Sequence, residues 1–260
     1  MMITVTKEGN TCLGDHLMAA FLVRVLLDNN IKAQFGCNLY RHLLEGIPFG
    51  RNLTVLDFDY DQGKIPLMQT SINRFKNHFP NLSNKSIEIK TPYVPIKFTH
   101  DPNSIPMDVV LVTTSGPWSK IRNWPYFDTL KKTLTEEGIT WVDLNSFGFN
   151  WANSKTSLIT VMNLIYKCKV FVSLDTGASH FATGILSKKT TKNNFIIQSG
   201  FTSFQYWASH YGDLFTPIEL NVACQGCLYR EIQQCPHGHM CMTQISKEAV
   251  MEYVRRGLKA

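Results

Sequence analysis

The sequence predicts an α/β fold with two doubly wound, Rossmann-like domains that face a cleft. Short apolar runs rich in β-branched residues alternate with helical patterns in both halves of the chain, which is typical of parallel sheets covered by helices. Prolines interrupt regular structure, and a group of them separates the halves: Pro92, Pro95, Pro102 and Pro106. We therefore expect an N-terminal domain at 1–106, a second domain at 107–245 and a terminal helix at 246–260.

The first half follows a strand–loop–helix–strand order. The pattern predicts strands over 3–6, 31–35 and 53–58, a buried helix over 16–28 and a short helix over 39–44. A further helix over 69–79 and a strand over 86–89 precede the proline-rich linker. Such an order gives parallel strands joined by helical crossovers.

The second half repeats this order on a larger scale. We expect strands over 108–113, 140–144, 169–174 and 195–198, and helices that begin at Trp124-Pro125 and cover 157–166 and 246–258. Proline is tolerated in a first helical turn because its missing N–H has no partner there. Ligands of such sheets bind beyond the carboxyl ends of the strands.

Composition bounds the class of protein. The chain has 260 residues, 44% of them hydrophobic, with a net charge of +6, which favours anionic partners such as a nucleotide or nucleic acid. No apolar run reaches the ~18 residues of a membrane span, and the first residues lack the pattern of a signal peptide. We expect a cytoplasmic protein, with the inner-membrane surface as an alternative location.

The stretch from Lys169 to Leu186 carries the strongest motif. A buried strand delivers Asp175-Thr176-Gly177 to the start of a helix, where free N–H groups and partial positive charge suit a diphosphate. Asp175 could then hold sugar hydroxyls, and His180 falls one turn into the helix. The alternative is that Asp175 or Thr176 merely caps the helix.

Two other groups fit the same chemistry. Gly14, Asp15 and His16 stand at the first helix start, where Asp15 could act as a general base toward an acceptor hydroxyl or simply cap the helix. Lys120 and Arg122 follow a strand of the second half. They suit phosphate binding, or they are solvated loop charges.

Cysteines gather late in the chain. Cys224 and Cys227 form a CxxC pair, followed by Cys235 and Cys241. Four such thiols are candidate ligands of a structural zinc, with His237 and His239 as extra candidate ligands and free thiols as the alternative.

Together these pieces resemble the heptosyltransferases of glycosyltransferase family 9, which have the two-domain GT-B fold. The segment from Ser173 to Ala182 is similar to the family's Asp-Thr-Gly-x-x-His-x-Ala signature. Gly14-Asp15, the Ser119-Lys120…Trp124-Pro125 segment and the late cysteines follow the family's order. Members are usually longer, so the acceptor-side N-terminal domain is reduced here.

The resemblance implies an inverting, metal-independent transfer of sugar from a nucleotide-diphosphate sugar. Asp15 would be the base, Lys120 and the backbone around Thr176-Gly177 would hold the diphosphate, and Asp175 the sugar hydroxyls, so no cofactor is required for catalysis. The acceptor would be a lipopolysaccharide core saccharide.

Two alternatives stay open. One is a phage-type enzyme that glycosylates a modified DNA base, which the charge and four aromatic residues permit: Trp118, Trp124, Tyr206 and Trp207. The other is an inactive module that binds a nucleotide sugar or nucleic acid. An NAD-type dehydrogenase is excluded because Gly9 to Gly14 does not supply the required glycine pattern.

Overall fold

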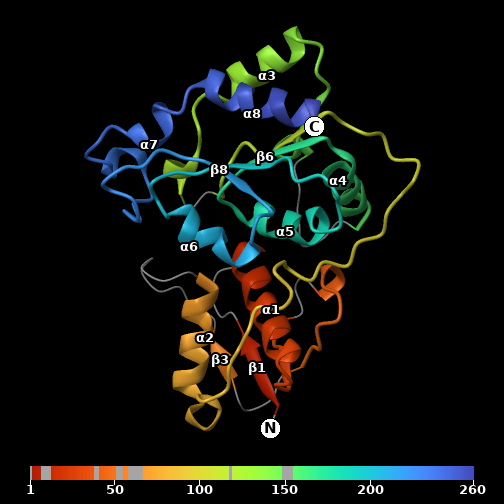
Figure 1. Ribbon diagram of the computed structural model, residues 1–260, viewed down its shortest axis with the longest axis vertical. Coiled ribbons are helices and arrows are strands. Elements are labelled where there is room, and N and C mark those ends of the chain that lie inside the picture. Colours follow the sequence, from red (N-terminus) through yellow and green to blue (C-terminus); the bar gives the residue numbers. More distant parts are fainter. Residues whose placement is uncertain are drawn as a thin grey trace.

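A computed structural model gives the fold of the chain and describes residues 2–6, 13–37, 41–50, 55–57, 67–116, 119–147 and 155–260, with the side chains at 55–57, 67, 147, 155–157 and 207 left undescribed. The architecture is α/β with two parallel sheets, which confirms the predicted fold class (Figure 1). The first sheet has the order β2-β1-β3 and the second the order β5-β4-β6-β7-β8. The exact domain boundaries, 106/107 and 245/246, stay a prediction.

The first sheet is built around β1 (Ile3–Thr6), which pairs in parallel with β2 (Ala33–Phe35) and β3 (Val55–Asp57). Helix α1 (Leu13–Asp28) connects β1 to β2, and α2 (Leu67–His78) follows β3. Helix α1 begins three residues earlier than predicted because Leu13 is already buried in the core. Gly14 and Asp15 therefore lie in its first turn.

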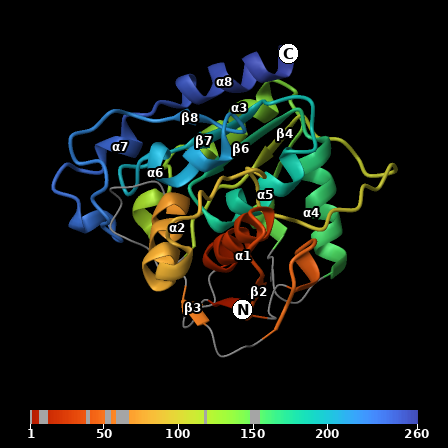
Figure 2. The same cartoon turned by 60° about the horizontal axis from the view of Figure 1, so that its bottom comes forward.

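The second sheet contains five parallel strands. They are β4 (Val109–Leu111), β5 (Trp141–Asp143), β6 (Val170–Leu174), β7 (Asn194–Ile197) and β8 (Thr216–Ile218). Helices α3 (Phe127–Glu136) and α8 (Lys247–Lys259) cover one face, and α4 (Lys155–Lys167) and α5 (Gly177–Leu186) cover the other (Figures 1 and 2).

Side chains alternate between these two faces, as they must in an extended strand. Val109 and Val170 pack with α3 and α8, whereas Val110 and Phe171 pack on the α4 and α5 side. This second core continues through α5 into α1 and the first sheet. One apolar core therefore joins the two sheets, and α1 stands against α5 (Figure 2).

The segment around residues 86–89 was expected to be a strand but is not one. The Asn29 side chain binds Glu88 instead, donating to its carbonyl at 2.8 Å and accepting from its N–H at 3.1 Å. A side-chain amide at the end of α1 thus takes the place of a neighbouring strand. The proline-rich linker is also part of the core, since Val94 and Ile96 are buried and Ile96 forms an isolated bridge with Leu44.

Other differences are at element ends. The short helix expected over 39–44 is described only from Arg41, where a 3₁₀ turn covers Arg41–Leu43. Trp124-Pro125 precedes α3 rather than opening it, since the helix begins at Phe127. The short elements α6 (Phe204–Ala208), α7 (Met240–Thr243) and β8 were not predicted. Among the described residues, no helix has both the length and the apolar content required to span a bilayer.

Candidate functional site

The turn between β6 and α5 forms the centre of the candidate site. All five residues of β6 are buried, and the strand ends directly before Asp175. Thr176 occupies the N-cap position of α5 with extended backbone angles, yet its side chain makes no capping hydrogen bond. Its hydroxyl therefore does not occupy the N–H groups of the first turn, and these groups carry the partial positive charge of the helix N-terminus.

Asp175 is held from two sides. Only 4% of the residue is exposed. The Thr202 hydroxyl donates to Oδ2 at 2.7 Å, and Nη1 of Arg122 lies 3.7 Å from Oδ1. Arg122 also donates to the backbone carbonyl of Asp175 at 2.8 Å. Because a carboxylate offers about four acceptor positions, these contacts fix the orientation of the group and leave acceptor capacity on Oδ1.

The two cations predicted to bind phosphate lie in different environments. The Arg122 side chain is 16% exposed, is tied to Asp175, and has its guanidinium carbon 5.2 Å from the centre of the Phe201 ring. The Lys120 side chain is 66% exposed, with Nζ 3.9 Å from a carboxylate oxygen of Glu231. An exposed ion pair of this length is weak, so Lys120 is the cation that an incoming anion can recruit.

A contact between two glycines brings the N-termini of α1 and α5 together. A Cβ atom on Gly177 would lie 2.7 Å from the backbone nitrogen of Gly14, and one on Gly14 would lie 3.2 Å from the Cα of Gly177. A Cβ atom cannot be accommodated at position 177 without movement of the backbone, whereas one at position 14 needs a shift of a few tenths of an ångström. Asp15 follows Gly14 directly and is half-buried. The structure therefore places the predicted base beside the Asp175-Thr176-Gly177 turn, although the two motifs are some 160 residues apart.

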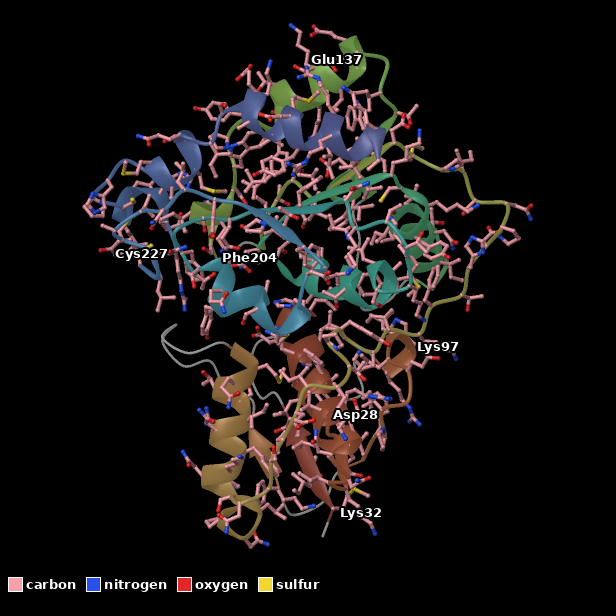
Figure 3. The ribbon with its side chains drawn as sticks, in the orientation of Figure 1. Asp28, Lys32, Lys97, Glu137, Phe204 and Cys227 are labelled. Atoms are coloured by element: carbon pink, nitrogen blue, oxygen red, sulfur yellow. The ribbon has the colours of Figure 1, made fainter. Side chains whose placement is uncertain are left out.

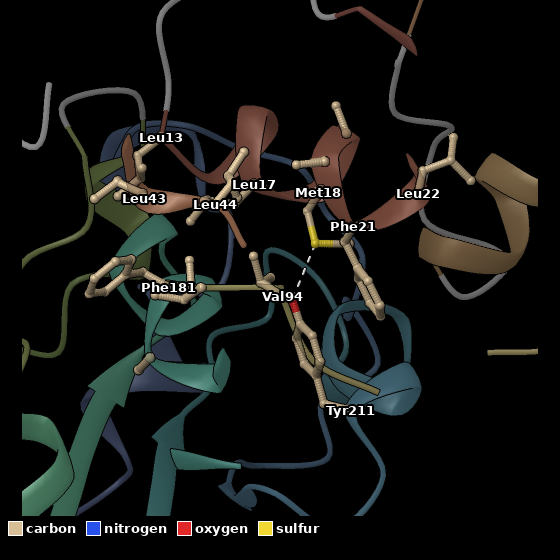
Figure 4. Packing of buried hydrophobic residues seen from close by; sticks show 14 of the residues in the cluster. Leu13, Leu17, Met18, Phe21, Leu22, Leu43, Leu44, Val94, Phe181 and Tyr211 are labelled. Carbon is tan, nitrogen blue, oxygen red and sulfur yellow. Dashed lines mark hydrogen bonds between the residues drawn. The ribbon is translucent and has the colours of Figure 1, made fainter. Parts of the chain in front are cut away.

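The His180 side chain links α5 to α1. Its Nδ1 lies 2.5 Å from the Tyr211 hydroxyl, which in turn contacts the sulfur of Met18 at 3.2 Å (Figure 4). Burial is the main cause that holds the pKa of His180 well below its ordinary value, and the positive charge of Arg122 adds to the effect. Burial also raises the pKa of Tyr211 well above 10. Both groups are thus neutral, and His180 serves as a hydrogen-bonding link rather than as a cation.

His16 lies in the core under the first sheet. It is buried and its ring makes an edge contact with Phe35 of β2, with centroids 6.4 Å apart. Two of the aromatic residues considered for DNA are also core residues: Tyr206 is buried, and the Trp124 indole donates to the Ile245 carbonyl. Trp118 and the side chain of Trp207 lie outside the described residues.

The four late cysteines are free thiols. Burial raises the pKa of Cys227 and Cys241, and the neighbouring cysteines add to this effect. Within the part of the chain that the structure describes, no three His, Cys, Asp or Glu side chains meet in an arrangement that could hold a metal ion. The arrangement of these thiols therefore does not match the zinc site predicted from their spacing. Elemental analysis tests directly whether a metal is bound.

Sequence reasoning missed Thr202, Phe201 and Tyr211. Thr202 and Phe201 follow β7, the strand beside β6, and the edge where parallel strands end is the usual place for ligand contacts. That rule was the available signal for these two residues. Tyr211 gave no signal, because it meets His180 and Met18 only in the folded chain.

No protein-family profile matches the chain, and no curated protein matches it. Solved structures do match. The chain is similar to the iron-containing dodecameric glycosyltransferase TibC from enterotoxigenic E. coli H10407, with a TM-score of 0.67, 13% identity, and coverage of 100% of this chain and 78% of TibC.

Two further structures match over nearly their full lengths. One is the ADP-heptose lipopolysaccharide heptosyltransferase II of E. coli, with a TM-score of 0.58, 15% identity and coverage of 100% and 99%. The other is a glycosyltransferase family 9 protein from Veillonella parvula DSM 2008, with a TM-score of 0.61, 11% identity and coverage of 99% and 97%. At these identities the likeness shows the fold, which is the GT-B type that the sequence motifs predicted.

Proposed function

We propose that the protein is a glycosyltransferase that moves a sugar from a nucleotide-diphosphate sugar to an acceptor hydroxyl. The observation that carries this proposal is the contact between Gly14 and Gly177. It sets Asp15, a candidate base, beside the N-terminus of α5, where the N-cap side chain makes no capping hydrogen bond, and beside a buried carboxylate, Asp175. Lys120 is available to a diphosphate at the same edge of the sheet.

In the proposed reaction the acceptor oxygen attacks the anomeric carbon, and its proton passes to the Asp15 carboxylate. The bond between that carbon and the diphosphate oxygen breaks in the same displacement, which inverts the configuration. Lys120 and the N-terminus of α5 stabilise the negative charge on the leaving diphosphate. These groups can supply that stabilisation without a divalent ion, which supports metal-independent transfer.

The similar structures suggest which donor to test first. TibC was solved with ADP-D-β-D-heptose, and the E. coli heptosyltransferase WaaC with ADP and with an ADP-2-deoxy-2-fluoro heptose. We therefore propose an ADP-linked heptose as the donor and a lipopolysaccharide core saccharide as the acceptor class. The description of TibC as iron-containing is a reason to include iron in any elemental analysis.

The test begins with donor binding in the presence of a chelator. ADP-, GDP-, UDP- and CMP-linked sugars are screened by thermal shift. A ligand at about 100 times its Kd adds roughly 2.7 kcal/mol of stability, which raises Tm by about 5–10 °C for a chain of this size. If no nucleotide sugar stabilises the protein, the proposed function fails.

Catalysis is then tested by substitution. Asp15→Asn should leave the donor-induced shift intact and lower transfer roughly 10²- to 10⁴-fold, the usual contribution of a general base. Asp28→Asn is the matched control on the same helix, since Asp28 pairs with Arg24 at the far end of α1, and it should keep full activity. Full activity in Asp15→Asn would refute the assigned role. The transfer assay is run separately with lipopolysaccharide core oligosaccharide and with DNA as the acceptor.

A further inference from the structure

The cysteine-rich segment, defined here as residues 224–241, is hydrogen-bonded to both loops that hold Asp175. One is the β4 loop, residues 119–123, which carries Arg122. The other is the β7 loop, residues 198–203, which carries Thr202. Figure 3 shows Cys227 of this segment at one end of the second sheet, beside α6. The segment was expected to matter for a metal, but its hydrogen bonds point to another role.

On the β7 side, the backbone of the segment binds the loop directly. The N–H groups of Gly226 and Cys227 both donate to the Gly200 carbonyl, at 2.8 and 3.2 Å, and the N–H of Leu228 lies 3.4 Å from the Phe201 carbonyl. Leu228 adopts a φ of +55° at this point. The contacts restrain the backbone immediately before Thr202.

On the β4 side, the segment binds Ile121 at both of its backbone polar groups. The Ile121 N–H donates to the Arg230 carbonyl at 3.3 Å, and the Ile121 carbonyl lies 2.5 Å from Nε2 of His239. A carbonyl can only accept, so Nε2 of His239 carries the proton. His239 is 3% exposed and adopts a φ of +60°. These bonds restrain the residue next to Arg122.

Backbone strain supports a positioning role. Three non-glycine residues with positive φ occur in the described backbone, and two of them, Leu228 and His239, stand at the two points of contact. Such conformations are unfavourable for a residue with a Cβ atom and persist where the surrounding contacts enforce them. Each of these two residues contacts a loop whose side chain binds Asp175. A segment that only filled space would not require such backbone conformations at the points of contact.

We propose that the cysteine-rich segment braces the donor site and that His239 is its main positioning residue. By holding Ile121 and Gly200, it keeps Arg122 and Thr202 on opposite sides of Asp175, and so fixes the carboxylate and the turn that follows it. This inference rests on the proposed function for its effect on a nucleotide sugar. It does not depend on a metal.

The experiment compares His239→Leu with His239→Gln and with Asn193→Ala. Leucine replaces the imidazole by an apolar side chain of similar bulk and removes the bond to Ile121, whereas the glutamine amide can still donate. Asn193→Ala is the matched control, because it removes one side-chain bond, 2.8 Å to the Gly257 carbonyl, at the opposite end of β7. His239→Leu should raise the Kd for the donor roughly 3- to 10-fold, the usual effect of one lost hydrogen bond. His239→Gln should restore most of the affinity, and Asn193→Ala should leave the Kd unchanged.

Amide hydrogen exchange gives a second readout that needs no ligand. In His239→Leu, exchange should become faster at Ile121 and in the β4 loop but not within β6. An unchanged Kd together with unchanged exchange in that loop would overturn the inference, whatever the effect of the substitution on Tm. If the wild-type protein binds no nucleotide sugar, the proposed function fails, and the exchange result alone decides whether the segment holds the loop.

Discussion

Substitution of Gly177 by alanine tests the contact on which the proposed function depends. The added Cβ would lie 2.7 Å from the Gly14 nitrogen, closer than non-bonded atoms approach, and the opposing atom is backbone that cannot rotate away. Helices α1 and α5 must therefore move apart. Overpacking of this kind costs about 1–3 kcal/mol, whereas replacing glycine by alanine in a helix gains at most ~1 kcal/mol. Gly177 is the first residue of α5, where the gain is smaller than in a helix interior. With mid-range values of ~2 kcal/mol for the overpacking and ~0.5 kcal/mol for the gain, the net change is a loss of about 1–2 kcal/mol.

Gly14→Ala provides a graded comparison. Its Cβ would lie 3.2 Å from the Gly177 Cα, so a shift of a few tenths of an ångström is enough. The steric cost and the gain in helix propensity then nearly cancel. Because 1 kcal/mol changes Tm by about 2–4 °C in a chain of this size, Gly177→Ala should melt about 2–8 °C below wild type and Gly14→Ala within about 3 °C of it.

Calorimetry measures the loss of stability in these variants, and a transfer assay measures the loss of activity. Transfer should fall in both variants and further in Gly177→Ala, because the separation moves Asp15 away from the turn that binds the donor. The double variant should lose more stability than the sum of the single variants, since the two methyl groups compete for one space. If Gly177→Ala melts at or above the wild-type temperature, the close approach of the two helices is wrong.

Three further outcomes follow from the contacts. Both ring nitrogens of buried His210 lack a hydrogen-bond partner in the described residues, and burial lowers its pKa to about 3. The unfolded chain therefore takes up a proton below pH ~6.5 that folded His210 refuses, and this group lowers stability by up to ~1.4 kcal/mol per pH unit from there toward pH 3. Because the pKa of buried His180 is lowered as well, His210→Phe should reduce, but not abolish, the fall of Tm between pH 6.5 and 4.5, whereas an unchanged pH profile would contradict this. Thr202→Val removes a hydrogen-bond donor from buried Asp175 and should lower the free energy of unfolding by about 1–3 kcal/mol. Thr202→Ser keeps the hydroxyl and should melt at the wild-type temperature. Equal melting temperatures of the two variants would contradict the bond. Elemental analysis of purified protein for zinc and iron decides the metal question: about one atom per chain supports a site at the late cysteines, and none refutes it.

The sequence predicted the β6–α5 unit closely, because the information is local. An apolar, β-branched run followed by small residues at helical spacing defines both elements within 20 residues, and β6 and α5 occupy that stretch. The β8 strand shows the opposite case. This strand has only three residues, with Pro217 in the middle, so it is too short to show an alternating pattern. The proline is tolerated because β8 lies at the edge of the sheet.

Partners distant in sequence could not be predicted in the same way. Asp175 was expected to face a sugar, but its bond from Thr202 and its contact with Arg122 depend on how two other loops end. His239 suggested a metal ligand by its spacing from the cysteines, yet its Nε2 binds the Ile121 carbonyl. Sequence spacing indicates which neighbouring side chains can lie close together. It does not indicate which distant backbone group, such as the Ile121 carbonyl, a side chain will bind in the folded protein.

Burial keeps the His180 and Tyr211 side chains neutral beside the contact between α1 and α5. Two helix N-termini meet at Gly14 and Gly177, and each carries a partial positive charge equivalent to about half a proton charge. A charged imidazole at His180 would add to this like charge, and burial keeps its pKa low enough to avoid it. Within the described residues, two carboxylates lie near these positive ends: Asp175, which Arg122 already faces, and Asp15 in the first turn of α1. A diphosphate bound at the turn would relieve the repulsion between the two helices, so donor binding should strengthen the contact between the two halves of the protein.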